Sequence, residues 1–176
     1  VDVAKSSDVV MPELKEAGNV LVQFDIRKDS YDLPDYEYIM KMYDGITQLM
    51  RENTVKSAYA LSGKGVAEAV AKMAFGNKLG VKFDASRPVR DYFKPDYGAI
   101  VVEIRETDLE QLSGLGFAYE KVGIVTADPV FEYGNESVSM TEALEALTGT
   151  LEKVYPTRSG AEDGAGADID TGLYEA

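Results

Sequence analysis

Apolar residues recur along this chain at two spacings, which distinguish its expected strands from its expected helices. Near the start, Val20, Val22, Phe24 and Ile26 alternate with other residues, and a period of two is typical of a strand. We therefore expect this stretch to be extended. A helix capped by Asp35 is expected next, because the following apolar residues recur at intervals of three and four: Ile39, Met42, Tyr43, Ile46, Leu49 and Met50.

Residues 57–84 are expected to form the segment around which the chain is organised. The pattern predicts a strand over residues 58–61, a glycine-rich turn, a helix, and a second strand over residues 80–83. We expect the helix to end at Gly76-Asn77, because glycine and asparagine tolerate the left-handed backbone that closes a helix. One face of the helix is expected to be buried: Val66, Ala67, Val70, Met73 and Ala74.

Polar residues within the same helix are spaced for an ion pair. Glu68 and Lys72 lie four positions apart, with the acid on the N-terminal side. This is the favourable order for a pair on a helix surface. The pair and the buried face together predict a helix that packs one side against a sheet.

The second half of the chain continues with alternating elements. Residues 98–104 are almost continuously apolar, which predicts a strand buried on both faces, and residues 119–126 and 129–133 read as two more strands. Capping boxes that start at Thr107 and Ser139 predict two helices. The last helix carries an apolar stripe: Met140, Leu144, Leu147 and Leu151.

This order of elements predicts an α+β or layered α/β fold with a mixed β-sheet covered by helices. The length of 176 residues suits one domain, assigned to residues 1–155. Residues 156–176 are rich in glycine, alanine and acids and are expected to be a tail or linker that a packing partner orders. Its Asp168-Ile169-Asp170 motif lacks the other ligands of a calcium loop. The first residue, Val1, suggests a fragment of a longer protein.

The composition excludes several classes of function. A formal net charge of −13 disfavours binding to nucleic acid or to an anionic membrane. The chain has no cysteine and no histidine, so thiolate chemistry and Ser-His-Asp or Cys-His catalysis are excluded. No apolar run approaches the roughly 20 residues of a membrane helix. These features fit a cytoplasmic protein.

The turn Ser62-Gly63-Lys64-Gly65 is the first candidate site. A glycine-rich turn before a helix can direct backbone N–H groups, the positive end of the helix dipole and a lysine at a phosphate or nucleotide. The turn lacks the spacing of a P-loop. The structural alternative is that Ser62 caps the helix while the glycines permit a tight turn.

The loop over residues 85–96 is the second candidate site. Arg87, Arg90 and Lys94 concentrate positive charge there in an acidic chain, and such residues can contact an anion or a neighbouring domain. The alternative is a solvated loop whose charges face water. The sequence supplies no metal site and singles out no catalytic residue.

The strand, the Ser-x-x-Gly turn and the run AEAVAKMAFGNKLGV resemble the C-terminal domain of the aminoimidazole ribonucleotide (AIR) synthetase superfamily. Within it, the resemblance is to phosphoribosylformylglycinamidine synthases of the large, clostridial type. It spans residues 15–155, and its other pieces are generic strand patterns: KEAGNVLVQF, YGAIVVEI and YEKVGIVT.

This resemblance implies a layered fold with partial ferredoxin-like topology. It also implies a parent ligase of purine biosynthesis that uses ATP, magnesium and glutamine-derived ammonia to convert formylglycinamide ribonucleotide to formylglycinamidine ribonucleotide. Relatives have a His-Asp-Val-Ser-Asp-Gly-Gly motif at residues 59–65, where this chain keeps only Ser62 and Gly65. No catalytic residue or metal ligand is therefore carried over from that motif.

We accordingly expect a domain that forms part of a ligand cleft and a domain interface, is inactive alone and binds no cofactor tightly. Its expected partners are an N-type ATP-binding domain, a glutaminase domain and other parts of the parent synthase, with a homodimer of the isolated chain as a further option. The alternatives are a ferredoxin-like regulatory module that binds a small ligand or dimerises, and a scaffold that binds none.

Overall fold

The computed structural model describes residues 9–152, and the predicted tail, with its Asp168–Asp170 motif, lies outside them. Within these residues, helices and 3-10 segments are interspersed among seven strands. The helices are α1 (Tyr36–Arg51), α2 (Gly65–Asn77), α3 (Leu109–Ser113) and α4 (Met140–Glu152), and the 3-10 segments are η2 (Val89–Phe93) and η3 (Glu106–Asp108). The strands are β1 (Val20–Phe24), β2 (Val55–Ala60), β3 (Gly80–Phe83), β4 (Ile100–Ile104), β5 (Tyr119–Thr126), β6 (Val130–Tyr133) and β7 (Glu136–Ser139).

The seven strands form one mixed sheet in the order β2-β4-β1-β5-β3-β6-β7. All neighbours are antiparallel except β3 and β6. The units β1-α1-β2 and β4-α3-β5 each connect two parallel strands with a third strand between them. Two interleaved units of this kind are the ferredoxin-like arrangement, so the predicted α+β class and partial ferredoxin-like topology are confirmed.

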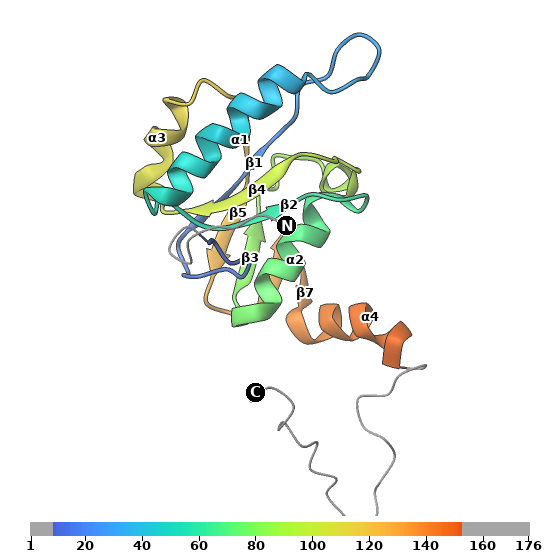
Figure 1. Cartoon of the computed structure of the whole chain (residues 1–176). Helices are drawn as coiled ribbons and strands as arrows, with labels where there is room; N and C mark the ends of the chain where they lie inside the picture. The colour runs from blue at the N-terminus through green and yellow to red at the C-terminus, as the bar shows by residue number, and fades with distance from the viewer. Residues whose placement is uncertain (1–8, 153–176) are drawn as a thin grey trace, which may run out of the picture. The chain divides into compact units, whose positions relative to one another are not determined.

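Side chains that alternate along β1 divide the core between the two faces of the sheet. Val20, Val22 and Phe24 pack with α1 and α3, whereas Leu21 packs with α2 on the opposite face. Figure 1 shows the resulting layers, with α1 and α3 on one side of the sheet and α2 on the other. The period of two in the sequence therefore corresponds to a strand buried on both faces.

Helix α1 forms as its sequence predicts. The Asp35 carboxylate accepts a hydrogen bond from the Tyr38 N–H at 3.0 Å, which caps the first turn. The buried side chains fall at intervals of three and four, as predicted: Ile39, Met42, Ile46 and Leu49. The same holds for the capping box of α4, where the Ser139 and Glu142 side chains each bond the other's backbone N–H.

The C-terminus of α2 differs from its prediction. The helix continues through Asn77, and the left-handed residue is Lys78, at φ 54°. Gly76 packs against Glu13, where a Cβ would lie 2.6 Å from the Glu13 Cβ, and the Asn77 side chain donates to the Leu14 carbonyl at 2.7 Å. Gly76 and Asn77 therefore contact the N-terminal segment instead of ending the helix. The left-handed residue that ends α2 is the next one, Lys78.

The second half contains one further wrong prediction and one element that was not predicted. Thr107 does not cap α3, because residues 106–108 form η3 and Asp108 precedes the helix without a side-chain capping bond. Strand β7 was not predicted from the sequence, because its four residues are mostly polar and exposed. It forms by pairing with β6 across a tight turn, which local propensity does not reveal.

Glu103 is a fully buried acid on strand β4, which lies between β2 and β1. Its carboxylate accepts hydrogen bonds from the backbone N–H groups of Lys15 and Glu16, at 2.9 to 3.1 Å. It also accepts bonds from the Asn19 amide at 2.7 Å and the Ser57 hydroxyl at 2.6 Å. These contacts join the N-terminal segment, β2 and β4 at one buried point.

The start of α2 depends on a glycine at position 65. Gly65 has φ +73°, and a Cβ there would lie 2.5 Å from the Lys94 carbonyl oxygen and 2.7 Å from that of Tyr92. Its missing side chain therefore lets the backbone after η2 lie directly against the beginning of the helix.

Among residues 9–152, no helix is long and apolar enough to span a membrane.

Replacing Glu103 with glutamine should destabilise the fold. The new amide group would present N–H donors to partners that are themselves donors, which should lower the free energy of unfolding by about 3 kcal/mol. Urea denaturation followed by circular dichroism measures the change. The exposed Glu110→Gln variant is the control, and equal stability of the two variants would contradict this role for Glu103.

Gly65→Ala and Gly116→Ala form a matched pair, because both glycines have φ near +72° but only Gly65 is crowded. Gly116→Ala should cost about 1 kcal/mol from the left-handed backbone alone. Gly65→Ala should cost about 3 kcal/mol, because clashes with two carbonyl oxygens are added. Equal midpoints of thermal unfolding for the two variants would show that the close approach at Gly65 carries no energetic weight.

Candidate functional site

A polar cavity of about 620 Å³ opens beside the end of β1. Its walls come from β1, from the segment between β3 and β4 that contains η2, and from the first residues of β5. It is lined by Gln23, Asp25, Val66, Asp84, Ser86, Arg87, Pro88, Asp91, Lys94, Pro95, Asp96, Glu120 and Lys121. Cations and carboxylates from distant parts of the chain thus face one space.

Arg87 is the most firmly held cation of this cavity. Its guanidinium donates to the Gln23 side-chain oxygen at 2.9 Å and to the Asp91 carbonyl at 3.2 Å. It lies 4.8 Å from the centre of the Tyr92 ring and 3.4 Å from a Glu120 carboxylate oxygen. Only 16% of the Arg87 side chain is exposed, so the guanidinium is held in a fixed orientation toward the cavity.

Two carboxylates face the same cavity close to Arg87. The Gln23 side-chain NH₂ group donates to Asp25 at 2.6 Å and to Asp96 at 3.0 Å, and so bridges the two acids. Burial raises the pKa of Asp25, and the neighbouring negative charge of Asp96 raises it further. Asp25 consequently takes up a proton more readily than an aspartate in water.

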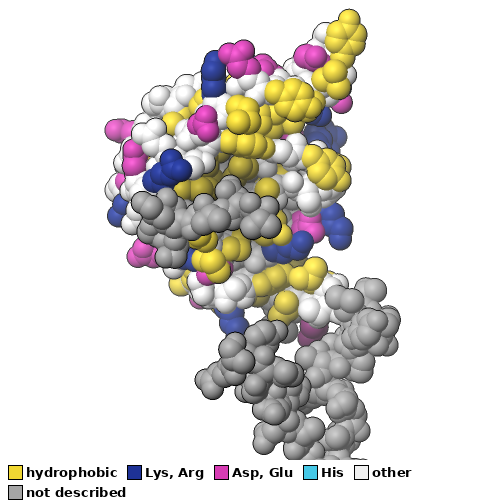
Figure 2. All heavy atoms as spheres, viewed as in Figure 1, with side chains coloured by type: hydrophobic (Ala, Val, Ile, Leu, Met, Phe, Trp, Pro, Cys, Tyr) yellow, Lys and Arg dark blue, Asp and Glu magenta, His cyan; other side chains and the backbone are white. Residues whose placement is uncertain are grey.

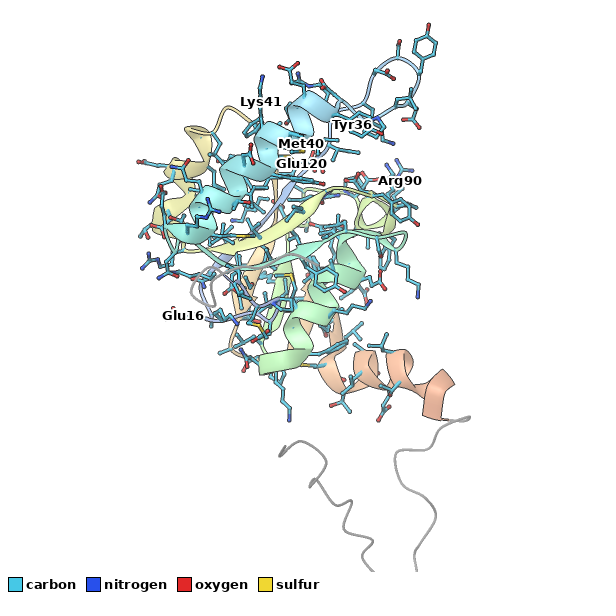
Figure 3. The ribbon with its side chains drawn as sticks, viewed as in Figure 1. Glu16, Tyr36, Met40, Lys41, Arg90 and Glu120 are labelled. Atoms are coloured by element: carbon cyan, nitrogen blue, oxygen red, sulfur yellow. The ribbon has the colours of Figure 1, made fainter. Side chains whose placement is uncertain are left out.

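The other two predicted cations have different positions. Lys94 lines the cavity and pairs with Asp91 at 2.6 Å, and this hydrogen bond holds the pKa of Asp91 below its usual value. Arg90 has an 83% exposed side chain that points away from the fold (Figure 3). The structure therefore brings Arg87 and Lys94 together and leaves Arg90 outside the cavity.

The glycine-rich turn lies directly behind this cavity. The Ser62 carbonyl accepts from the Gly65 N–H at 3.2 Å and from the Asp96 N–H at 3.4 Å. The Ser62 hydroxyl donates to Glu68, which lowers the pKa of that carboxyl. Ser62 therefore does not cap α2 with its side chain, and Lys64, which precedes the helix, makes no side-chain capping bond either.

The remaining positions of the turn differ in exposure. Lys64 is exposed, whereas Ser62 and Gly63 are half-buried and Gly65 is buried. A Cβ on Gly63 would lie 2.5 Å from the Tyr97 hydroxyl oxygen, so a tyrosine of the neighbouring loop covers this glycine. Binding of a phosphate by the turn remains a prediction.

Sequence reasoning did not single out Gln23, Asp25 or Asp96. The alternating pattern over residues 20–26 places Asp25 near the end of the predicted strand, where polar side chains often face a ligand, and this is the signal that could have identified it. Asp96 gives no comparable signal, because it is one of 31 acidic residues and only the fold brings it to Asp25.

The donor set of the described residues does not fit a metal. No group of three or more Asp and Glu side chains within residues 9–152 is arranged to hold an ion. Asp25 and Asp96 instead share the amide of Gln23 and lie beside the Arg87 guanidinium. The described residues therefore supply no set of ligands for magnesium.

Comparison with known proteins gives the family of the chain. The family described as "AIR synthase related protein, C-terminal domain" matches residues 9–135. A probable phosphoribosylformylglycinamidine synthase, chloroplastic/mitochondrial, from Arabidopsis thaliana is 30% identical over 135 residues, which are 71% of this chain and 10% of the relative. The synthase subunit PurL of Rhodococcus erythropolis is 27% identical over 114 residues, covering 60% and 15% of the two chains.

Solved structures agree with the fold. The structure of PurLQS from Thermotoga maritima superposes with a TM-score of 0.67 at 16% identity, over 78% of this chain and 28% of that one. T. maritima PurL complexed with ATP gives a TM-score of 0.65 at 15% identity, over 78% and 27%. The chain thus spans a small part of the length of the proteins that it matches. Because the family match extends over most of the described residues, the chain belongs to the AIR synthase related proteins, as a C-terminal domain of that family.

Proposed function

We propose that this chain is a domain of a phosphoribosylformylglycinamidine synthase, the ATP- and glutamine-dependent ligase that converts formylglycinamide ribonucleotide to formylglycinamidine ribonucleotide. The observation that carries the proposal is the family match over residues 9–135, together with curated relatives from a plant and a bacterium that both bear this enzyme's name. The proposed domain comprises residues 1–155, with residues 156–176 as a tail or an interdomain linker.

The polar cavity is the part of the domain that we assign to ligand. Arg87 and Lys94 can neutralise a phosphate, while the oxygens of Asp25 and Asp96 can accept hydrogen bonds from hydroxyl or amino groups. The Ser62–Gly65 turn supports this wall from behind. A ligand with both anionic and hydroxyl groups, such as a ribonucleotide, matches this division of charge.

The rest of the active site is proposed to lie on other domains of the parent enzyme. The chain spans 10% and 15% of the two relatives named above, and its described residues offer no cluster that fits magnesium. An N-type domain is proposed to supply most contacts to ATP and its magnesium, and a glutaminase to supply ammonia. Location in the cytoplasm is part of the same proposal.

Calorimetry on the isolated chain tests the proposal against a regulatory module. We expect ATP to bind weakly or not at all, because one wall of a cleft leaves most of the ligand in water. The chain should also form no formylglycinamidine ribonucleotide by itself in an ammonia-dependent assay. Micromolar or tighter binding of an amino acid or a nucleotide to the isolated chain would favour the regulatory alternative and contradict the proposed function.

Arg87→Ala and Arg90→Ala test the cavity in the intact synthase. Loss of the Arg87 guanidinium should raise the KM for ATP or for the ribonucleotide about tenfold or more, since a hydrogen bond to a charged group contributes about 1.5–3 kcal/mol. Arg90→Ala should leave both KM values within about twofold, a difference below 0.5 kcal/mol. Steady-state kinetics measures both variants. Equal KM values for Arg87→Ala and Arg90→Ala would show that the cavity is not part of the ligand site.

A further inference from the structure

A second cavity, of about 380 Å³, lies where the β6–β7 hairpin extends the sheet beyond α2. Cross-strand partners point to the same face of a sheet, so Phe131 and Val138 share a face, as do Tyr133 and Glu136. Phe131 and Tyr133 pack against the core on the α2 side. The cavity is lined by Ala67, Phe83, Val89, Tyr92, Phe93, Phe131, Glu132, Tyr133, Glu136, Ser137 and Val138.

Aromatic rings make the floor of this cavity rigid and apolar. Phe83 packs against Tyr92 at 5.0 Å and against Phe131 at 6.5 Å between ring centroids, and Tyr92 packs against Tyr133 at 6.1 Å. The Tyr92 hydroxyl is not available to a ligand, because it donates to the carbonyls of Asp84 and Val122, at 2.8 and 3.0 Å. A ligand in this cavity therefore meets ring carbons.

The rim of the cavity is apolar and exposed. Phe93 is 61% exposed, Val89 50% and Val138 48%. Three large apolar side chains at one opening form a surface that gains free energy when covered, at roughly 25 cal/mol per Å². The dimensions and lining are those of a pocket that accepts one bulky apolar side chain with its neighbours.

The charged residues of the lining are both acidic. Glu132 and Glu136 line the cavity, and neither makes an ion pair with a residue of the described part of the chain. The nearby cations of the η2 segment, Arg90 and Lys94, are already paired with Asp91. The carboxylates of Glu132 and Glu136 consequently favour a positively charged partner at the rim of the cavity.

Strand β7 adds backbone groups beside this cavity. It is the last strand of the sheet and, among residues 9–152, pairs with β6 alone. The outer edge of such a strand presents N–H and C=O groups that can pair with another extended chain. Side chains from β7 itself, including Val138, line the cavity, so a strand added to this edge would carry its own side chains to the opening.

We propose that the β7 edge and this apolar cavity bind an extended polypeptide segment from outside this chain, with one bulky apolar side chain flanked by Lys or Arg. A second copy of this chain fits poorly, because each copy carries a net charge of −13. Residues 153–176 of the same chain also fit poorly, because they hold five acids against two basic residues. The acidic rim therefore selects a basic partner.

A labelled peptide tests this site directly. Fluorescence anisotropy is measured with the full chain and a peptide of alternating pattern, Lys-Thr-Phe-Thr-Lys, with acetyl and amide ends. We expect saturable binding that weakens at least tenfold when serine replaces the phenylalanine or when glutamate replaces both lysines. No binding at millimolar protein, or equal binding of the charge-reversed peptide, would overturn the proposal.

Protein variants locate the binding. Phe93→Ser and Glu136→Lys should each lower the affinity for the peptide about tenfold. The first removes an apolar wall of the cavity, and the second reverses a charge at its rim. Met40→Ser is the matched control, because Met40 is 60% exposed on α1 and does not line this cavity. Figure 3 labels Met40 on α1, and Figure 2 shows in the same view that hydrophobic side chains are exposed on this face of the molecule. A control that weakens binding as much as Phe93→Ser would place the peptide elsewhere and reject the site.

Two measurements exclude the other occupants. Sedimentation velocity should show a monomer across the concentrations used. A dimer that dissociates in the Phe93→Ser variant would show instead that a second copy of the chain occupies the cavity. Deleting residues 153–176 should leave peptide affinity within twofold. A tenfold gain on deletion would show that the chain's own C-terminal segment occupies the cavity and would overturn the proposal.

Discussion

The buried carboxylate of Glu103 is the contact on which the centre of this domain depends. It accepts from two backbone N–H groups of the N-terminal segment and from the Asn19 and Ser57 side chains. An acid at this depth is tolerated because every partner is a donor. The contact fixes where the chain enters β1, and β1 lies between β4 and β5 in the sheet.

The segment inserted between those units builds both cavities. In chain order, α2, β3 and η2 stand between β2 and β4, and a plain ferredoxin-like unit has only a short connection there. The segment around η2 forms a wall of each cavity: Arg87, Asp91 and Lys94 line the polar one, whereas Val89, Tyr92 and Phe93 line the apolar one. Gly65 allows this segment to lie directly against the start of α2. One insertion thus contributes walls both to the polar cavity, for which we propose a ligand, and to the apolar cavity, for which we propose a partner.

The role that we propose for the polar cavity is to bind and orient a ligand. Arg87 is oriented by Gln23 and Tyr92, and the raised pKa of Asp25 comes from burial and from Asp96. A fixed guanidinium beside two bridged carboxylates can hold a ligand with both anionic and hydroxyl groups. The chain keeps Ser62 and Gly65 of the turn motif that its resemblance implies, without the histidine and the acids of that motif. This supports the proposal that other domains carry the catalytic groups.

The sequence alone determined the elements whose signal is local. The period of β1, the Asp35 cap and stripe of α1, the Glu68–Lys72 pair and the Ser139 capping box each depend on residues a few positions apart. The sequence AEAVAKMAFGNKLGV, which includes most of α2, indicated the family for the same reason. Only the tertiary structure decided the strand order, the pairing of β7 with β6 and the left-handed conformation of Lys78. It also decided that Asp25 and Asp96, 71 positions apart, share one amide, because such contacts depend on packing between segments that no local pattern encodes.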